Sequence, residues 1–351
     1  MSLAAAMRRL PAGGLSLGLA PVLGAAAAIL AVALAAALML GDVRVGAADV
    51  AATLGNRLLG LSLPVDPIRE GIIWHYRASR AVVAMACGAA LAVCGVVLQA
   101  LLRNPLAEPY LLGISAGASA GAVSVIVLAA GAGLLGVPAG ALAGAALAFA
   151  LVGLLAFGAG GGTERIILAG VAGSQLFNAA TAFIVASSAD AEQTRGILFW
   201  MLGSLGGVRW PDAALAVPVA LAGLGLCLWR ARALDAFAFG EDAAAALGVE
   251  VVRLRAGLLA LTAVLTAAVV SLIGAVGFVG LVIPHAMRFL VGPSHGRLIP
   301  AAALAGAVFL TGADVLSRLV LPGQVLPVGV VTALFGAPAF ALILWRSRGR
   351  R

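Results

Sequence analysis

The sequence contains no lysine, and this absence excludes one class of protein. All 22 positively charged residues among its 351 residues are arginine. The phosphate-binding loop of nucleotide hydrolases requires a lysine that reaches the nucleotide phosphates. The chain therefore has no ATPase site of that kind, and ATP-driven work must take its energy from another subunit.

Charge of either sign is scarce. Charged residues make up 10% of the chain, whereas a soluble domain carries about 25%. Hydrophobic residues make up 63%. This composition excludes a soluble enzyme, a disordered segment and a nucleic-acid-binding domain. Since a membrane-spanning helix takes roughly 20 apolar residues, the apolar residues suffice for at most about eleven spans.

Cysteine and histidine are also few. There are three of each, namely Cys87, Cys94, Cys227, His75, His285 and His295. The cysteines lie in apolar runs, and neither residue type shows metal-ligand spacing or a disulfide framework. We expect this chain to bind no metal and no cofactor of its own.

Long stretches without charge predict the membrane spans. One stretch, 109–163, is long enough for two spans, whereas 256–287 is too long for one and too short for two. The remaining stretches hold one span each: 10–41, 81–102, 166–189, 213–229, 298–313 with its extension past Asp314, and 319–345. The count is nine or ten.

The arginines at the two termini decide between these counts. Arg8 and Arg9 lie near one end of the chain, and four arginines lie in 346–351 at the other. The positive-inside rule places both termini in the cytoplasm, which requires an even number of spans. We therefore predict an all-α polytopic membrane protein with about ten transmembrane helices. One domain covers 1–351, and 256–291 forms one full helix and one short one.

Two hydrophilic segments separate the predicted spans. Residues 42–80 are expected outside, and residues 230–255 are expected inside. In the inner segment Asp235 is a candidate cap for one short helix, Gly240 ends it, and Glu241 opens a second. Two such helices would form a handle for a partner protein, and a solvated linker is an equal alternative.

Three arginines depart from the inside bias. The ten-span topology puts fourteen arginines and six acids inside, and eight of each outside. Arg77 and Arg80 precede the second span at a helical spacing of three, and Arg318 lies at the outer end of another. They dock an acidic partner through strong carboxylate contacts, extend to the lipid headgroups, or pair internally with Asp66, Glu70 or Asp314.

Two other functions are weaker interpretations. Ser115 and Ser119 each match the Gly-x-Ser-x-Gly motif of hydrolases, which would suit an intramembrane serine protease. Glycine-rich helices generate this pattern freely. An ion-coupled carrier would hold acidic residues in mid-membrane, and no predicted span has one at its centre.

Three long blocks resemble the FecCD-type permeases, the membrane subunits of importers for ferric siderophores, haem and vitamin B12. They are Arg103-Asn-Pro-Leu-Ala-Glu-Pro-Tyr-Leu-Leu-Gly-Ile-Ser-Ala-Gly117, residues 274–288 and residues 326–338. Residues 168–172 and 239–248 also fit. The resemblance runs from about residue 20 to residue 346.

The resemblance implies a type II ABC importer fold in the bacterial inner membrane. It implies a homodimer with two ATP-binding subunits, which hold ATP and Mg, and a periplasmic binding protein that delivers the ligand. The family's docking arginines match Arg77, Arg80 and Arg318, with Arg-Ala-Ser-Arg in place of Arg-Leu-Pro-Arg. Its ATPase-coupling helices match residues 234–249, including Phe239, Gly240, Glu241, Leu247 and Gly248. Its cytoplasmic gate matches Asn104, Leu106, Thr163 and Glu164, although Thr163-Glu164 departs from the usual hydroxyl pair.

The substrate is less defined by the sequence. Trp74, His75 and Tyr76 lie next to Arg77 and would line an outer mouth with aromatic surface and an imidazole. This favours an iron chelate, with haem first, ferric siderophore second and cobalamin third. An interfacial aromatic belt explains Trp74 and Tyr76 equally well.

Overall fold

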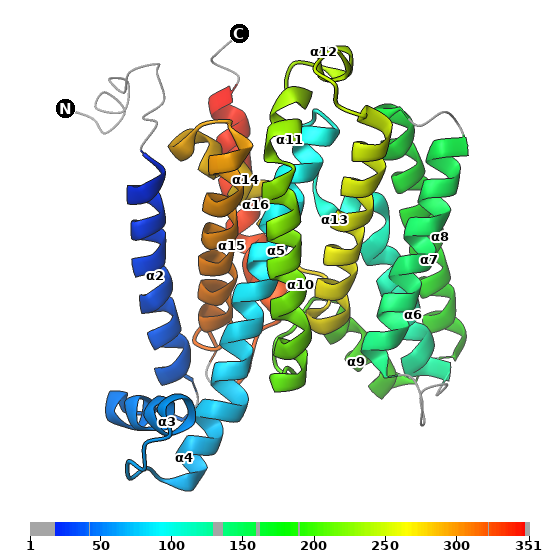
Figure 1. Ribbon diagram of the computed structural model, residues 1–351. Coiled ribbons are helices and arrows are strands. Elements are labelled where there is room, and N and C mark those ends of the chain that lie inside the picture. Colours follow the sequence, from blue (N-terminus) through cyan, green and yellow to red (C-terminus); the bar gives the residue numbers. More distant parts are fainter. Residues whose placement is uncertain are drawn as a thin grey trace, which may run out of the picture.

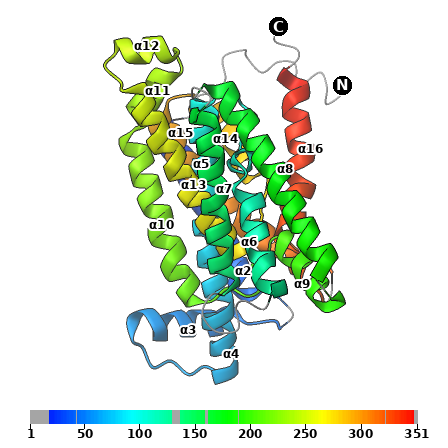
Figure 2. The ribbon, with the colours of Figure 1, turned by 90° about the vertical axis from the view of Figure 1, so that its right-hand side faces the viewer.

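The computed structural model describes residues 18–41, 43–128, 136–158, 162–188, 190–321 and 323–347. Within these ranges the chain is helical, and its only β pairing is an isolated bridge between Leu321 and Gln324. The long helices lie side by side in one bundle (Figures 1 and 2). The predicted all-α fold is confirmed for this part of the chain.

In the part of the chain that the structure describes, ten apolar helices form the bundle. Seven in the described ranges are long and apolar enough to cross a membrane: α2 (Leu19–Met39), α5 (Ser79–Leu101), α7 (Val137–Gly158), α8 (Thr163–Ser188), α10 (Trp210–Trp229), α13 (Val251–Ile273) and α15 (His295–Ser317). Three further apolar helices are α6 (Ile114–Leu128), α14 (Val279–Val291) and α16 (Val328–Ser347). Their total matches the number expected from the charge-free stretches.

The two ends of the bundle carry different short helices. α2 begins and α16 ends at the same end of the bundle as α11 (Ala231–Phe237) and α12 (Glu241–Ala246), at the top of Figure 1. We call this the α12 end. The opposite end, here called the α3 end, carries α3 (Ala47–Leu59), α4 (Pro67–Gly71) and α9 (Ala191–Met201). This arrangement agrees with an even number of spans. The terminal arginines used for the predicted orientation, Arg8, Arg9, Arg348, Arg350 and Arg351, lie outside the described residues.

The ambiguous stretch 256–291 folds as one long helix, α13, and one short helix, α14. The turn between them includes Gly274, whose φ is +74°, a conformation that favours glycine. α14 packs closely on α5, since a Cβ on Gly95 would lie 1.9 Å from the carbonyl oxygen of Gly280. The predicted short helix is therefore packed inside the protein, as membrane depth requires.

Glycines spaced by four join α6 to α7. A Cβ added to Gly121 would lie 2.0 Å from the carbonyl oxygen of Gly140, and one added to Gly144 would lie 2.1 Å from that of Gly117. Such close backbone approach is a common way to pack helices in lipid. Gly113, the first member of the α6 series, instead occupies a left-handed turn with φ +72°.

Some predicted boundaries were wrong. Within the predicted outer segment, an unbroken helical run from Pro67 leads into α5. The last span begins only at Val328, because a tight turn with the Leu321–Gln324 bridge precedes it. The last five residues of 230–255 belong to α13. The sequence predicted neither α3 nor α9, each of which carries charged residues.

Candidate functional sites at the two ends of the bundle

The helical run that leads into α5 contains a seven-residue π-helix, η1 (Ile72–Ala78). π-Helical turns are rare in proteins, and those that occur often lie at functional sites. Arg77 lies in η1, and its buried guanidinium donates hydrogen bonds to the carbonyl oxygens of Leu38, at 2.8 Å, and Val43. Carbonyls at a helix C-terminus lack partners within the helix and carry partial negative charge. Arg77 therefore holds the end of α2 against the start of α5.

Asp314, near the end of α15, joins the other two arginines. Its Oδ1 lies 2.6 Å from Nε of Arg80, and its Oδ2 lies 3.0 Å from Nη2 of Arg318. Asp314 is fully buried, and the two arginine side chains are only 11% and 9% exposed. Arg318 also donates to the carbonyl oxygens of Ala37 and Leu40, each at 3.2 Å. α2, α5 and α15 are thus held together at the α3 end.

These side chains form what we call the arginine cluster: Arg77, Arg80, Arg318 and Asp314. The structure brings the three predicted docking arginines together. Of the three acids considered as internal partners, Asp314 is the one that pairs with Arg80 and Arg318. Asp66 instead caps α4, and Glu70 pairs with Arg57 at 2.8 Å. With three positive charges and one negative, the cluster is cationic and suits carboxylates of a partner. Its docking role stays a prediction.

The predicted substrate mouth lies beside the cluster. The ring centroid of Trp74 is 4.6 Å from that of Trp210, whose Nε1 donates to the Trp74 carbonyl oxygen at 3.0 Å. The guanidinium of Arg209 lies 4.3 Å from the ring centroid of Tyr76. His75 is exposed. Trp74 and Tyr76 therefore already contact the start of α10, and their role toward a substrate stays a prediction.

At the α12 end, residues 230–250 form the predicted loop with two short helices. Gly240 precedes α12 with φ +104°, and Gly248 follows it with φ +82°, both in the region that favours glycine. Phe239 is 79% exposed and Leu247 is 71% exposed. The loop thus presents two large apolar side chains between its polar residues.

Two polar contacts tie the 230–250 loop to long helices. Asp235 accepts a hydrogen bond from the backbone N–H of His295 at 2.8 Å, and its Oδ1 lies 2.6 Å from His295 Nδ1. Asp235 lies inside α11, so its predicted role as a helix cap was wrong. Glu241 in α12 pairs with the buried Arg255 of α13. The loop is therefore connected to α15 and to α13.

The predicted gate residues lie on two separate segments. Oδ1 of Asn104 accepts from the N–H of Leu106 at 2.9 Å, which shapes the loop after α5, and Leu106 is 45% exposed. Thr163 and the exposed Glu164 begin α8. The end of α5 and the start of α8 both lie at the α12 end (Figure 1). Gating by these residues stays a prediction.

The hydrolase interpretation lacks its structural context. Ser115 and Ser119 both lie within α6, whereas the hydrolase motif needs a strand-to-helix elbow. Cys87, Cys94 and Cys227 are buried free thiols. Among the residues that the structure describes, no group of three or more histidine, cysteine, aspartate or glutamate side chains is placed to hold a metal ion.

Comparisons with known proteins give one family. The sequence model of the FecCD transport family matches residues 29–346. A cobalamin import system permease protein of Halobacterium salinarum is 40% identical over 81% of this chain and 76% of its own length. A vitamin B12 import system permease protein of Klebsiella pneumoniae is 40% identical over 79% of this chain and 83% of its own. An uncharacterized ABC transporter permease of Bacillus subtilis is 39% identical over 82% of this chain and 82% of its own length.

Solved structures agree with this result. A protein described as a metal-chelate type ABC transporter, in an inward-facing conformation, has a TM-score of 0.80 and 30% identity, and the match covers 93% of this chain and 99% of that one. The PsaBC complex of Streptococcus pneumoniae has a TM-score of 0.54 at 19% identity, over 78% and 92% of the two chains, and is similar in fold alone.

Proposed function

The chain belongs to the FecCD transport family and is a permease of an ABC importer of the metal-chelate or vitamin B12 type, and we propose that its two ends bind two different partners. The α12 end faces the cytoplasm of a bacterial cell and binds two ATP-binding subunits, which supply ATP and Mg. The α3 end faces the periplasm and receives a substrate-binding protein on the arginine cluster. A second copy of the chain completes the transport path.

α15 gives this proposal a mechanical element. Its first residue, His295, contacts Asp235 in the 230–250 loop, and Asp314 near its last residue holds Arg80 and Arg318. ATP binding and hydrolysis in the partner shift α11 and α12, and α15 and α13 follow through their contacts with the loop. The bundle then alternates between outward-open and inward-open states.

The exposure of Phe239 and Leu247 carries the proposal. Exposed large apolar side chains on a short loop outside the membrane spans suit a protein interface. Gly240 and Gly248 fix the turns that present them. The adjacent contact between Glu241 and Arg255 anchors the loop to α13, so force applied to the loop reaches a spanning helix.

The experiment is co-purification with the cognate ATP-binding subunit. We expect Phe239→Ser with Leu247→Ser to lower the recovered ATP-binding subunit by at least about tenfold, since central apolar interface residues contribute about 2 kcal/mol or more. The matched control is Leu58→Ser with Leu59→Ser on α3, where the side chains are 66% and 74% exposed at the opposite end. Equal recovery from both double variants would contradict the assignment of the ends.

For the substrate, we propose a bulky metal chelate, with three candidates. The names of the relatives favour cobalamin. The exposed His75 beside the arginine cluster favours haem, with a ferric siderophore next. The absorption spectrum of the ligand retained by the cognate binding protein separates the three. Uptake of that ligand into vesicles that contain the assembled complex then tests transport.

A further inference from the structure

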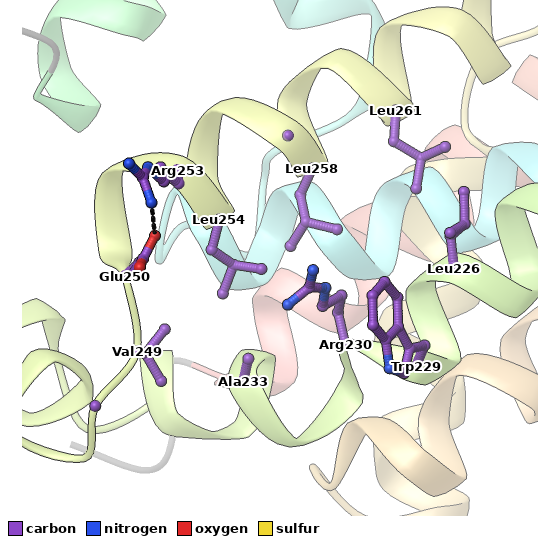
Figure 3. A pocket seen from close by; sticks show the side chains of 12 residues that line it. Leu226, Trp229, Arg230, Ala233, Val249, Glu250, Arg253, Leu254, Leu258 and Leu261 are labelled. Carbon is purple, nitrogen blue, oxygen red and sulfur yellow. Dashed lines mark hydrogen bonds and ion pairs between the residues drawn. The ribbon is translucent and has the colours of Figure 1, made fainter.

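A pocket of about 660 Å³ opens between α10 and α13 at the α12 end. Its deeper wall is formed by leucines of both helices, among them Leu226, Leu258 and Leu261 (Figure 3). Its rim carries Trp229, Arg230 and Arg253. The pocket is thus apolar inside and cationic at one edge, and Gly248 is its only lining residue with a role proposed above.

Arg230 carries a positive charge that no acidic side chain neutralises within the described ranges. Its guanidinium lies 4.0 Å from the ring centroid of Trp229. Within the described ranges, no hydrogen bond or ion pair of this guanidinium is found. Arg253, in contrast, pairs with Glu250 at 2.8 Å, and both side chains are largely exposed. The rim therefore carries a net positive charge, centred on Arg230.

The position of the pocket along the spanning helices fits the depth where lipid headgroups meet their chains. Trp229 is the last residue of α10, and α13 begins at Val251, so the rim marks the end of two spanning helices. Trp229 is 70% exposed, as is typical of tryptophans at a membrane interface. Leu221 and Val264, farther along the same helices, are 62% and 60% exposed apolar side chains that fit a lipid-facing surface.

We propose that this pocket binds an anionic phospholipid. The headgroup phosphate pairs with Arg230, with Arg253 as a second cation, and an acyl chain lies on the leucines of α10 and α13. A soluble anion would leave the apolar wall without a partner. An acidic segment of another protein would have to place its backbone beside that wall. The inner leaflet is the source if the α12 end is cytoplasmic as proposed above, but binding itself does not depend on that orientation.

This ligand would act on the 230–250 loop. Ala233 of α11, together with Gly248 and Val249 after α12, also lines the pocket. A bound lipid therefore contacts α10, α13 and both ends of the loop at once. Occupancy should hold α11 and α12 in one arrangement relative to the spanning helices.

The test is native mass spectrometry of the full-length chain in detergent, with phosphatidylglycerol as the probe. Phosphatidylcholine with the same chains and glycerol 3-phosphate are the comparison probes. We expect Arg230→Gln to weaken phosphatidylglycerol binding about fivefold, the effect of one arginine on an anionic membrane surface. Arg232→Gln is the matched control, because Arg232 is exposed two residues away and outside the pocket lining.

A second pair of variants tests the apolar wall. Gly257 lines the pocket with open space where a Cβ would lie, so Gly257→Leu should fill the pocket and displace the lipid. Gly225→Leu, equally open on α10 and outside the lining, is its control. Weaker phosphatidylglycerol binding in Arg230→Gln and loss of the lipid adduct in Gly257→Leu, with no change in either control, support the proposal.

Four results would overturn it. Equal retention of phosphatidylcholine would make the site merely apolar, and equal binding of glycerol 3-phosphate would make it a soluble-anion site. Phosphatidylglycerol binding that is unchanged in Arg230→Gln would remove the headgroup contact. Displacement of the lipid by the ATP-binding subunit, without recovery when lipid is added, would identify that subunit as the occupant.

Discussion

At the α3 end, three arginines that are buried or only about a tenth exposed are held by Asp314 and by carbonyls of α2, whereas at the α12 end Phe239 and Leu247 lie mostly exposed on a short loop. Both regions are expected to bind partner proteins. The α3 end would bind its partner through arginines that already have internal contacts. The α12 end would bind its partner through apolar side chains that have few internal contacts.

This difference decides what a substitution at each end reports. A buried ion pair that loses one member leaves a charge without compensation, so stability changes first. An exposed apolar side chain contributes little to the fold, so its replacement reports on the partner. A partner at the α3 end must also compete with Asp314 for the arginines, whereas a partner at the α12 end has no such competitor at Phe239 or Leu247.

The largest expected effect is that of Asp314→Asn. This variant keeps the shape of the side chain but leaves Arg80 and Arg318 without their carboxylate, and we expect it to lower the free energy of unfolding by about 3–5 kcal/mol. Thermal unfolding of the purified chain in detergent measures the loss. Asp49→Asn is the control, because the pair of Asp49 with Arg69 is more exposed and should contribute at most about 1 kcal/mol. Equal losses of unfolding free energy in Asp314→Asn and Asp49→Asn would show that burial does not make the contacts of Asp314 more stabilising than the contact of Asp49.

The next effect concerns docking. We expect Arg80→Gln to raise the binding-protein concentration needed for half-maximal ATPase stimulation by at least about tenfold, because a charged contact that loses one member typically costs 2 kcal/mol or more. Arg57→Gln is the control, because Arg57 lies at the same end but pairs with Glu70 outside the cluster. It should change the binding-protein concentration for half-maximal stimulation by less than about twofold. A lower melting temperature of Arg80→Gln with unchanged stimulation would give the cluster a structural role only.

The sequence predicted the features that depend on local chemistry. The charge-free stretch 256–287 indicated one long and one short helix over 256–291, and α13 and α14 have those lengths. Gly240 and Glu241 indicated a break followed by a new helix, and α12 begins there. Each of these signals lies within the segment that it describes.

The remaining features depend on contacts that sequence spacing does not reveal. Arg77 and Arg80 were expected on one helix face; Arg77, in the π-helix Ile72–Ala78, contacts α2, and Arg80, in α5, contacts α15. The contact of Asp235 with His295 joins residues 60 positions apart, and no local signal marks it. The sequence placed Asp314 among three candidate partners of the arginines. The packing of α15 on α5 brings it, and not the other two, to Arg80.

A moderate effect should appear where the two ends are linked. Asp235→Ala removes the side-chain contact between α11 and the first residue of α15, and we expect transport per ATP hydrolysed to fall about two- to thirtyfold, the range of 0.5–2 kcal/mol of coupling. Substrate uptake and phosphate release, measured on the same vesicles, give this ratio. Asp242→Ala is the control, since Asp242 is an exposed neighbour in α12. An unchanged ratio in Asp235→Ala would exclude this contact from the linkage.

The smallest expected effect belongs to Glu250→Gln, at the α12 end. Glu250 and Arg253 form an exposed pair three residues apart, with side chains 67% and 84% exposed, and such helix-surface pairs contribute at most about 0.5 kcal/mol. We therefore expect the free energy of unfolding to change by no more than that, and the change to vanish in high salt, because exposed charges are screened. The same thermal unfolding used for Asp314→Asn measures it. A loss as large as that of Asp314→Asn would mean that ionic contacts stabilise both ends equally, and the contrast between a buried charged end and an exposed apolar end would fail.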